Sequence, residues 1–210
     1  MVESRYYKRF KRAEKRTETM GQERLNLPFV QFVMLMPYFT AESIKALALI
    51  PPPKKFYKKD VPKDLQLVTF GMLTRLQRAP VDNDYLKTCC ALVSTLTDVP
   101  ADIVASRRAY DVIGIVNMVQ NEMERIGKLF QSIKADLSAD EISAGADRLE
   151  FGTFGLVDWY AKRMGITDHE EVFSTPWARV FQCMKIDFEN NEFEKRYRKI
   201  IENKQKVRKH

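Results

Sequence analysis

The sequence predicts a mainly α-helical fold: an irregular multi-helix bundle with an extended basic N-terminal arm and a long C-terminal helix. Apolar residues recur over most of the chain at the spacing of one helix face. Alternating strand patterns are scarce, and prolines and capping residues separate the apolar segments. The chain has 210 residues, of which 45% are hydrophobic, so it can bury a sizeable core without disulfides or metals. We detect no internal repeat in the sequence.

The first segment is a basic arm over residues 1–27, in which Tyr6, Phe10 and Ala13 form a thin apolar stripe. Such a narrow stripe predicts a marginal helix that is stable only when it is docked. An apolar helical segment is expected to follow over residues 28–50.

This apolar segment divides into two helices. The first is expected to end near Pro37, and Thr40 is expected to cap a second helix that ends at Ile50. Three consecutive prolines stop that helix. A Pro/Lys-rich, polyproline-like linker is therefore predicted over residues 51–63.

The remainder is predicted to be one helical domain over residues 64–205 with a basic tail over 206–210. Gly165 is expected to end one of its helices, and Thr175 and Pro176 are expected to cap and begin the last one. Apolar spacing predicts helices over residues 64–78, 85–96, 109–134, 153–164 and 177–204, a short polar helix within 138–148, and a turn at 101–108.

The formal net charge of +7 is concentrated at the two ends of the sequence. Residues 1–24 hold eight Lys/Arg and four Glu, and residues 192–210 hold eight Lys/Arg and three Glu. The 167 residues between them are nearly neutral, with 19 basic and 21 acidic side chains. Basic ends on a neutral body favour attachment to nucleic acid or to an acidic protein surface, and the alternative is that they only promote solubility.

The cysteines indicate a reducing compartment. Cys89, Cys90 and Cys183 do not form a disulfide framework, and all three fall on apolar helix faces, where a buried structural thiol is expected. No secretory signal fits the charged N-terminus. The longest apolar runs are shorter than the roughly 20 residues that span a bilayer, so no membrane association is expected.

No motif for catalysis or metal binding is present in the sequence. The two histidines, His169 and His210, are far apart, and no Cys/His cluster has zinc spacing. No phosphate-binding loop of the P-loop type and no nucleophile elbow occurs. We therefore expect no enzymatic activity, no cofactor, no metal and no small-molecule substrate.

One glycine pair has a functional alternative. Gly152 and Gly155 have the G-x-x-G spacing of a loop that clamps nucleic-acid backbones, but no basic residue lies between them. The structural interpretation is a tight turn into a helix, with Phe151 and Phe154 anchored in the core.

Aromatic side chains lie beside basic ones in the arm, in the linker and in the last helix. Such pairs anchor protein–protein interfaces, and they also stack on nucleic-acid bases. In the last helix the apolar residues fall at helical spacing, which favours a docking helix. The candidate partner-binding residues are Tyr6, Arg9, Arg12, Arg16, Lys54, Lys55, Phe56, Tyr57, Lys58, Phe193, Arg196, Tyr197 and Arg198.

Two stretches resemble proteins of tailed phages. The segment DYLKTCCALVSTLTDVPADIVASRRAYDVIGIVNMVQNEM (84–123) resembles tail-assembly chaperones, in which a helix ending in a Leu-Thr turn precedes a short acidic-hydrophobic step and a second apolar helix. The segment FGTFGLVDWYAKRMGITDHEEVFSTPWARVFQC (151–183) resembles small structural proteins of crAss-like phages that infect Bacteroidetes. The basic arms and the lysine-rich linker depart from the chaperones.

This resemblance implies a virion structural protein, a connector or tail ring subunit that forms a homo-oligomer and contacts neighbouring virion proteins. It would be present in the host cytoplasm during assembly and then in the virion. A tail-assembly chaperone is the alternative within phages. A basic accessory protein that binds nucleic acid is the alternative outside them.

Overall fold

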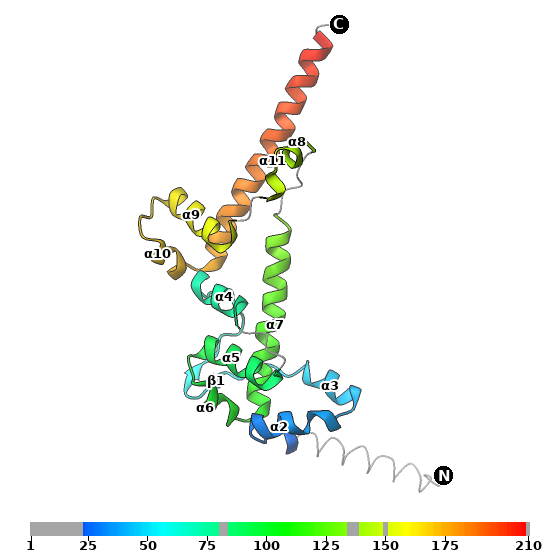
Figure 1. Cartoon of the computed structure of the whole chain (residues 1–210), viewed down its shortest axis with the longest axis vertical. Helices are drawn as coiled ribbons and strands as arrows, with labels where there is room; N and C mark the ends of the chain where they lie inside the picture. Colours follow the sequence, from blue (N-terminus) through cyan, green and yellow to red (C-terminus); the bar gives the residue numbers. More distant parts are fainter. Residues whose placement is uncertain (1–22, 80–83, 134–138, 149–150, 209–210) are drawn as a thin grey trace, which may run out of the picture. The chain divides into compact units, whose positions relative to one another are not determined.

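The computed structural model describes residues 23–79, 84–133, 139–148 and 151–208. The predicted mainly α-helical, multi-helix fold is confirmed (Figure 1). The described residues form two compact units: unit 1 contains residues up to 65 and 75–122, and unit 2 contains 66–74 and 123–210. The residues predicted as one helical domain, 64–205, are thus divided between the two units.

Unit 1 is built around the first part of the longest of its helices, α7. Its apolar core includes Phe29, Phe32, Val93, Val104 and Val112, all at most 1% exposed. Its elements are α2 (Phe29–Leu35), η1 (Met36–Tyr38), α3 (Ala41–Leu47), β1 (Lys55–Phe56), β2 (Lys59–Asp60), α5 (Tyr85–Thr97), α6 (Ala101–Ala105), the end of α4 (Phe70–Gln77) and the start of α7 (Ala109–Gln131).

The stretch predicted as a polyproline-like linker, 51–63, contains a small antiparallel hairpin over residues 55–60. Phe56 pairs with Lys59 in its register, and Tyr57 and Lys58 take positive φ values of 45° and 66° in the turn. Phe56 and Val61 are buried. The hairpin has a packed apolar side, which a solvated connector lacks.

Several predicted helix boundaries are confirmed and others shift. The Thr40 hydroxyl accepts a hydrogen bond from the Ser43 N–H at 3.2 Å, so it caps α3 as expected. Residues 101–105 form helix α6, where a turn was expected. The helix predicted from residue 64 begins only at Phe70, after a stretch of turns.

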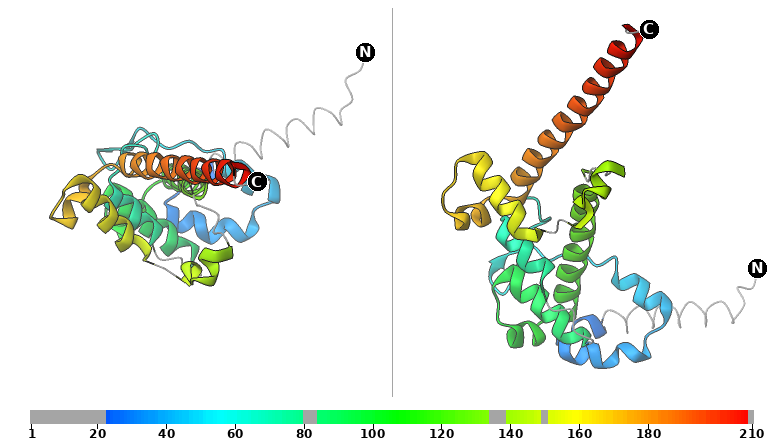
Figure 2. Two further views of the ribbon diagram at one scale, coloured as in Figure 1. Left: turned by 90° about the horizontal axis from the view of Figure 1, so that it is seen from above. Right: turned by 45° about the horizontal axis from the view of Figure 1, so that its top comes forward.

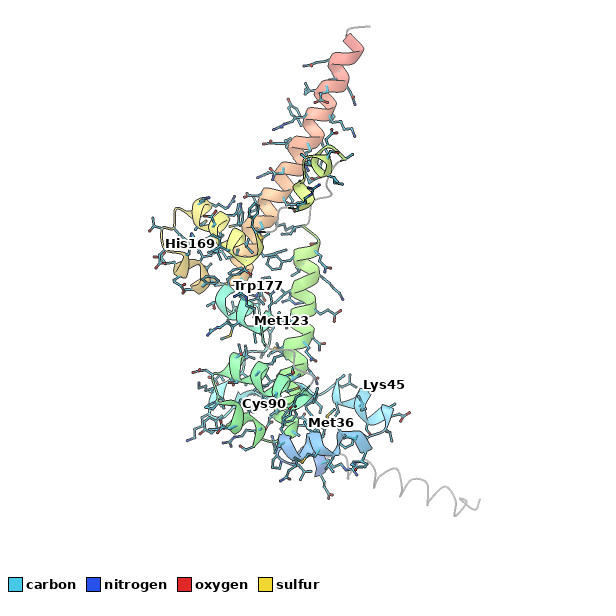
Figure 3. The ribbon with its side chains drawn as sticks, viewed as in Figure 1. Met36, Lys45, Cys90, Met123, His169 and Trp177 are labelled. Atoms are coloured by element: carbon cyan, nitrogen blue, oxygen red, sulfur yellow. The ribbon has the colours of Figure 1, made fainter. Side chains whose placement is uncertain are left out.

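Unit 2 has its core at the start of its long last helix, α11. Trp177, labelled in Figure 3, lies there with its ring 6.1 Å from that of Phe130. Val157, Tyr160, Val172 and Val180 of unit 2 are also buried. The elements of unit 2 are the first residues of α4, the end of α7, α8 (Ala139–Ser143), η2 (Ala146–Arg148), α9 (Gly152–Met164), α10 (His169–Ser174) and α11 (Trp177–Arg208).

The predicted end of α9 is confirmed, whereas the start of α11 differs from the prediction. Gly165 closes α9 in a left-handed conformation, as predicted. Thr175 is instead the C-cap of α10, and its hydroxyl donates to the Glu171 carbonyl at 3.1 Å. Helix α11 begins at Trp177, directly after Pro176.

The two units repeat one succession of elements, although no repeat was detected in the sequence. In each unit a helix of 13 residues ends in a left-handed residue and is followed by a helix of five or six residues and then a long helix. Asp98 and Gly165 occupy the left-handed position, with φ of 54° and 66°. The helices α5, α6 and α7 of unit 1 thus correspond to α9, α10 and α11 of unit 2.

A pair of backbone hydrogen bonds fixes the long helix of unit 1 to an earlier short helix, α2. The Phe29 N–H donates to the Arg107 carbonyl at 2.7 Å, and the Ala109 N–H donates to the Leu27 carbonyl at 2.9 Å. The first N–H groups of a helix have no partner inside it, so these bonds satisfy one such group in each helix.

The same pair of bonds recurs in unit 2 between α4 and α11. The Phe70 N–H donates to the Thr175 carbonyl at 2.7 Å, and the Trp177 N–H donates to the Val68 carbonyl at 3.2 Å. Buried side chains coincide as well, since Val104 and Val112 of unit 1 have counterparts in Val172 and Val180, and Phe29 has one in Phe70. The two units are therefore a structural repeat with little sequence identity.

Candidate protein–protein interface

The predicted partner-binding residues fall into three groups with different outcomes. Those of the basic arm, Tyr6, Arg9, Arg12 and Arg16, lie outside the described residues. The second group lies on the hairpin of unit 1, and the third lies on α11 of unit 2.

The lysines of the hairpin are exposed, but only one of its two aromatic rings is. Phe56 is only 3% exposed, so this ring is part of the core and is not available to a partner. Tyr57 is exposed and lies under the Arg107 guanidinium, whose carbon is 4.6 Å from the ring centroid. This cation–π contact holds Tyr57 against unit 1. The three lysines of the group, Lys54, Lys55 and Lys58, are exposed.

The group on α11 is exposed as a whole. From Glu189 to Gln205 every residue is exposed except Glu192 and Ile201, which are half-buried. Figures 1 and 2 show from three directions that this part of α11 continues beyond α9 and α10. Most helical stability in proteins comes from packing of one helix face, so the stability of this part of α11 depends on contacts along its own surface or with another molecule.

Apolar side chains form a stripe along this exposed helix. Ile186, Phe193 and Ile200 are spaced seven residues apart, and Tyr197 lies between the last two. They are 50%, 61%, 52% and 56% exposed, respectively. The rings of Phe193 and Tyr197 stack with centroids 6.1 Å apart. We call these four residues the α11 stripe; their seven-residue spacing is that of the seam in a coiled coil.

Charges along the same helix are separated into two blocks. The acidic block, residues 186–194, has four Asp/Glu and no Lys/Arg. The basic block, residues 195–204, has five Lys/Arg and one Glu. Arg196 and Arg198 of the predicted group belong to the basic block, on either side of Tyr197.

Ion pairs within α11 join the blocks where they meet. Arg198 donates to Glu194 at 3.1 Å, and the Lys195 Nζ lies 3.5 Å from a Glu192 oxygen. Each such exposed pair supports the helix by about 0.2–0.5 kcal/mol. Nearer its start, α11 is tied to α9 by the ion pair of Asp187 with Arg163.

The unit repeat compares the start of the stripe with a covered part of α7. Gly114 of α7 lies against Pro51 and Pro52 of the segment before the hairpin, and Met118 is 6% exposed. The corresponding residues of α11, Gln182 and Ile186, are exposed. This part of the face is thus closed by the chain itself on α7 and open on α11.

Sequence reasoning missed two further exposed apolar surfaces. Phe151 and Phe154 were predicted as core anchors, but they are 69% and 67% exposed, and Phe154 packs only edge-on against His169. In unit 1, exposed apolar side chains gather on α2, η1, α3 and the turn after α3: Met34, Tyr38, Ile44 and Leu49. Apolar spacing alone could not separate these positions from core positions.

The thiols of α5 are buried as predicted, whereas Cys183, which was also expected to be buried, is half-buried. Cys89 and Cys90 are buried, and Cys90 is labelled in Figure 3. Burial raises the pKa of each thiol to about 11. Among the described residues no cluster of three or more His, Cys, Asp or Glu is placed to hold a metal ion. None of the helices within the described ranges is long and apolar enough to cross a membrane.

Comparisons with protein-family models, with curated proteins and with solved structures found no match to this chain.

Proposed function

We propose that the chain is a non-enzymatic structural protein that works through protein–protein contacts, as a connector or tail ring subunit of a tailed-phage particle. The observation that carries the first part is the α11 stripe. Two stacked rings and two isoleucines are exposed on a part of α11 that the described residues of unit 2 leave uncovered. Exposed apolar rows with flanking arginines are typical of interface anchors.

The phage part of the proposal is supported by the resemblance of residues 84–123 and 151–183 to phage assembly and structural proteins. The second segment includes α9, α10 and the start of α11, so it positions the exposed helix. A subunit of this kind is made in the host cytoplasm and stays in the virion.

The test is the native mass of the purified chain, alone and with the neighbouring particle proteins, before and after nuclease treatment. A protein assembly keeps its mass after nuclease. Reversing the charge of Arg12, Arg16, Arg196 and Arg198 should reduce assembly and leave folding intact. A chain that stays monomeric with all particle proteins, or a variant that unfolds but still assembles, contradicts the proposal.

The basic block of α11 favours one second candidate, binding to nucleic acid. Its five Lys/Arg lie within ten residues of one exposed helix. Each phosphate that a protein neutralises releases counterions, so the affinity of such a binder falls steeply with salt. Loss of the complex on nuclease treatment, together with a steep salt dependence, would favour this candidate.

A further inference from the structure

We propose that two copies of this chain bind each other through α11, antiparallel, with the acidic block of one copy against the basic block of the other. This inference rests on the proposed function because it concerns the same exposed helix. It adds that the partner of this helix is a second copy of the chain. The occupant follows from the charge, the spacing and the open face of α11.

Charge determines the orientation. Parallel pairing places four carboxylates beside four carboxylates and five cations beside five cations. Antiparallel pairing places each acidic block beside a basic block, because the two adjoin at residues 194 and 195 and are nearly equal in length. Like charges that face each other across an interface disfavour the parallel arrangement, and opposite charges favour the antiparallel one.

The helix macrodipole does not explain this separation. It favours cations near the C-terminal end of a helix, but its effect fades within the last turn. The basic block begins at Lys195, whereas α11 ends at Arg208, a distance of more than three turns at about 3.6 residues per turn. Pairs within the helix use Lys195 and Arg198 but do not cover the rings of the stripe.

The stripe provides the apolar seam of this contact. Its members recur at seven residues with Tyr197 offset by four from Phe193, so they stay on one side of the helix over about four turns. Asn190, between Ile186 and Phe193, and Lys204, four residues after Ile200, also occupy seam positions. Polar residues at such positions restrict the register and the number of helices, which agrees with a defined pair and not a large bundle.

The repeat shows which contacts are missing at the start of the stripe. In unit 1 the matching part of α7 meets Pro51 and Pro52 at Gly114, and the Asn117 side chain donates to the Leu47 carbonyl at 2.7 Å. Within unit 2 no described segment holds the equivalent place on α11, since Lys185, the counterpart of Asn117, is exposed. A second α11 supplies the missing cover.

Charge-reversal variants test the pairing. One variant carries Glu189→Lys, Glu192→Lys and Glu194→Lys, and a second carries Lys195→Glu, Arg196→Glu and Arg198→Glu; Asp187 is kept because it pairs with Arg163. Each variant alone should weaken self-association about tenfold or more, measured by sedimentation and native mass after nuclease. The combined variant restores opposite blocks and should associate within about threefold of the unmodified chain. Circular dichroism checks that all three fold.

A second pair of variants tests the seam. Phe193→Gln with Tyr197→Gln should abolish self-association, whereas Asn191→Ala with Gln205→Ala, on another face of the exposed helix, should not change it. Zero-length carboxylate–amine cross-linking of mixed isotope-labelled and unlabelled chains gives the orientation. Links from Glu189 to Lys199 or Lys204 of the second copy are expected.

The outcomes separate this inference from the proposed function. An oligomer that all α11 variants leave unchanged overturns the pairing and leaves an assembly role standing. Links between Glu202 and Lys204 of two copies, without links between opposite blocks, overturn the antiparallel orientation. A monomer that forms complexes only with particle proteins overturns self-pairing alone. Failure of the combined variant to recover association overturns the role of charge.

Discussion

Gly114 lies against Pro51: a Cβ on Gly114 would stand 2.2 Å from the Pro51 carbonyl oxygen and 2.8 Å from its carbonyl carbon. Both atoms belong to backbone, so no side chain can move aside to make room. The absence of a side chain at residue 114 therefore sets how closely the segment that leads into the hairpin can approach α7.

Gly114→Ala should destabilise unit 1 by about 3 kcal/mol, because overpacking against rigid neighbours costs about that much. Gly127→Ala is the matched control in the same helix, since a methyl group there would meet no heavy atom within 4 Å and alanine favours helix by roughly 0.5–1 kcal/mol. Urea unfolding followed by circular dichroism measures both. Equal stability of the two variants would contradict the close approach.

Phe56→Ala should cost about 3–5 kcal/mol, because it empties a buried site in the hairpin. Tyr57→Ala, one residue on, should cost about 1 kcal/mol or less, since it removes an exposed ring and one cation–π contact. The comparison is made by thermal unfolding. Similar small losses for both residues would mean that the hairpin is only a connector.

The buried thiols should react slowly. A pKa raised from 9.0 to about 11 lowers the thiolate fraction of Cys89 about a hundredfold at pH 8. A disulfide reagent should therefore modify the half-buried Cys183 first, with the other two reacting only in urea. Three equal rates in the native protein would refute this.

The same pKa shift has a consequence for stability. Because folding favours the neutral thiols, their contribution is complete below pH 9 and is lost as the pH rises toward 11. Burial, with a smaller effect of the nearby Cys89, also raises the pKa of Tyr85. The urea midpoint of unit 1 should therefore decrease from pH 9 to pH 11, and a flat profile over this range would count against burial of these groups.

Substitutions at Gly165 and Asp98, the two left-handed positions of the repeat, should change stability in opposite directions. Gly165→Ala should cost about 1–2 kcal/mol, because φ is 66° and the new methyl meets no other atom, so only backbone strain acts. Asp98→Gly should relieve such strain, but it also removes the 3.2 Å ion pair of the Asp98 carboxylate with Lys59, so the net gain should stay below about 1 kcal/mol; Lys59 keeps its 3.0 Å bond to the residue 98 carbonyl. Both Trp residues, Trp159 and Trp177, belong to unit 2, so fluorescence reports the first variant and circular dichroism reports both.

The helices that were predictable combine an apolar stripe with a local end signal. Thr40 and Gly165 mark their helix ends by side-chain capping and by a left-handed turn, which are properties of a few adjacent residues. Helix α6 was missed because its five residues are too few to show a period. The hairpin was missed because prolines and lysines surround Phe56 and its strands are two residues long.

The candidate interface was predictable only where exposure follows from position in a long helix. Phe193 and Tyr197 lie on the later part of α11, and they are exposed. Phe56, Phe151 and Phe154 were assigned to the wrong environment, because an aromatic side chain carries no sign of its own burial. The repeat depends on equivalent backbone hydrogen bonds at Phe29 and Phe70. Backbone hydrogen bonds do not require particular residue types, so the sequence does not reveal them.

The pairing of Thr69 with Pro176 joins residues that are synthesised far apart, and residues 75–122 of unit 1 lie between them. Closing so long a loop has an entropic cost and slows folding. During translation the chain therefore completes unit 1 first, while Phe70 and Leu73 remain without their partners until the start of α11 emerges. The exposed part of α11 is therefore synthesised after all the residues that complete both cores.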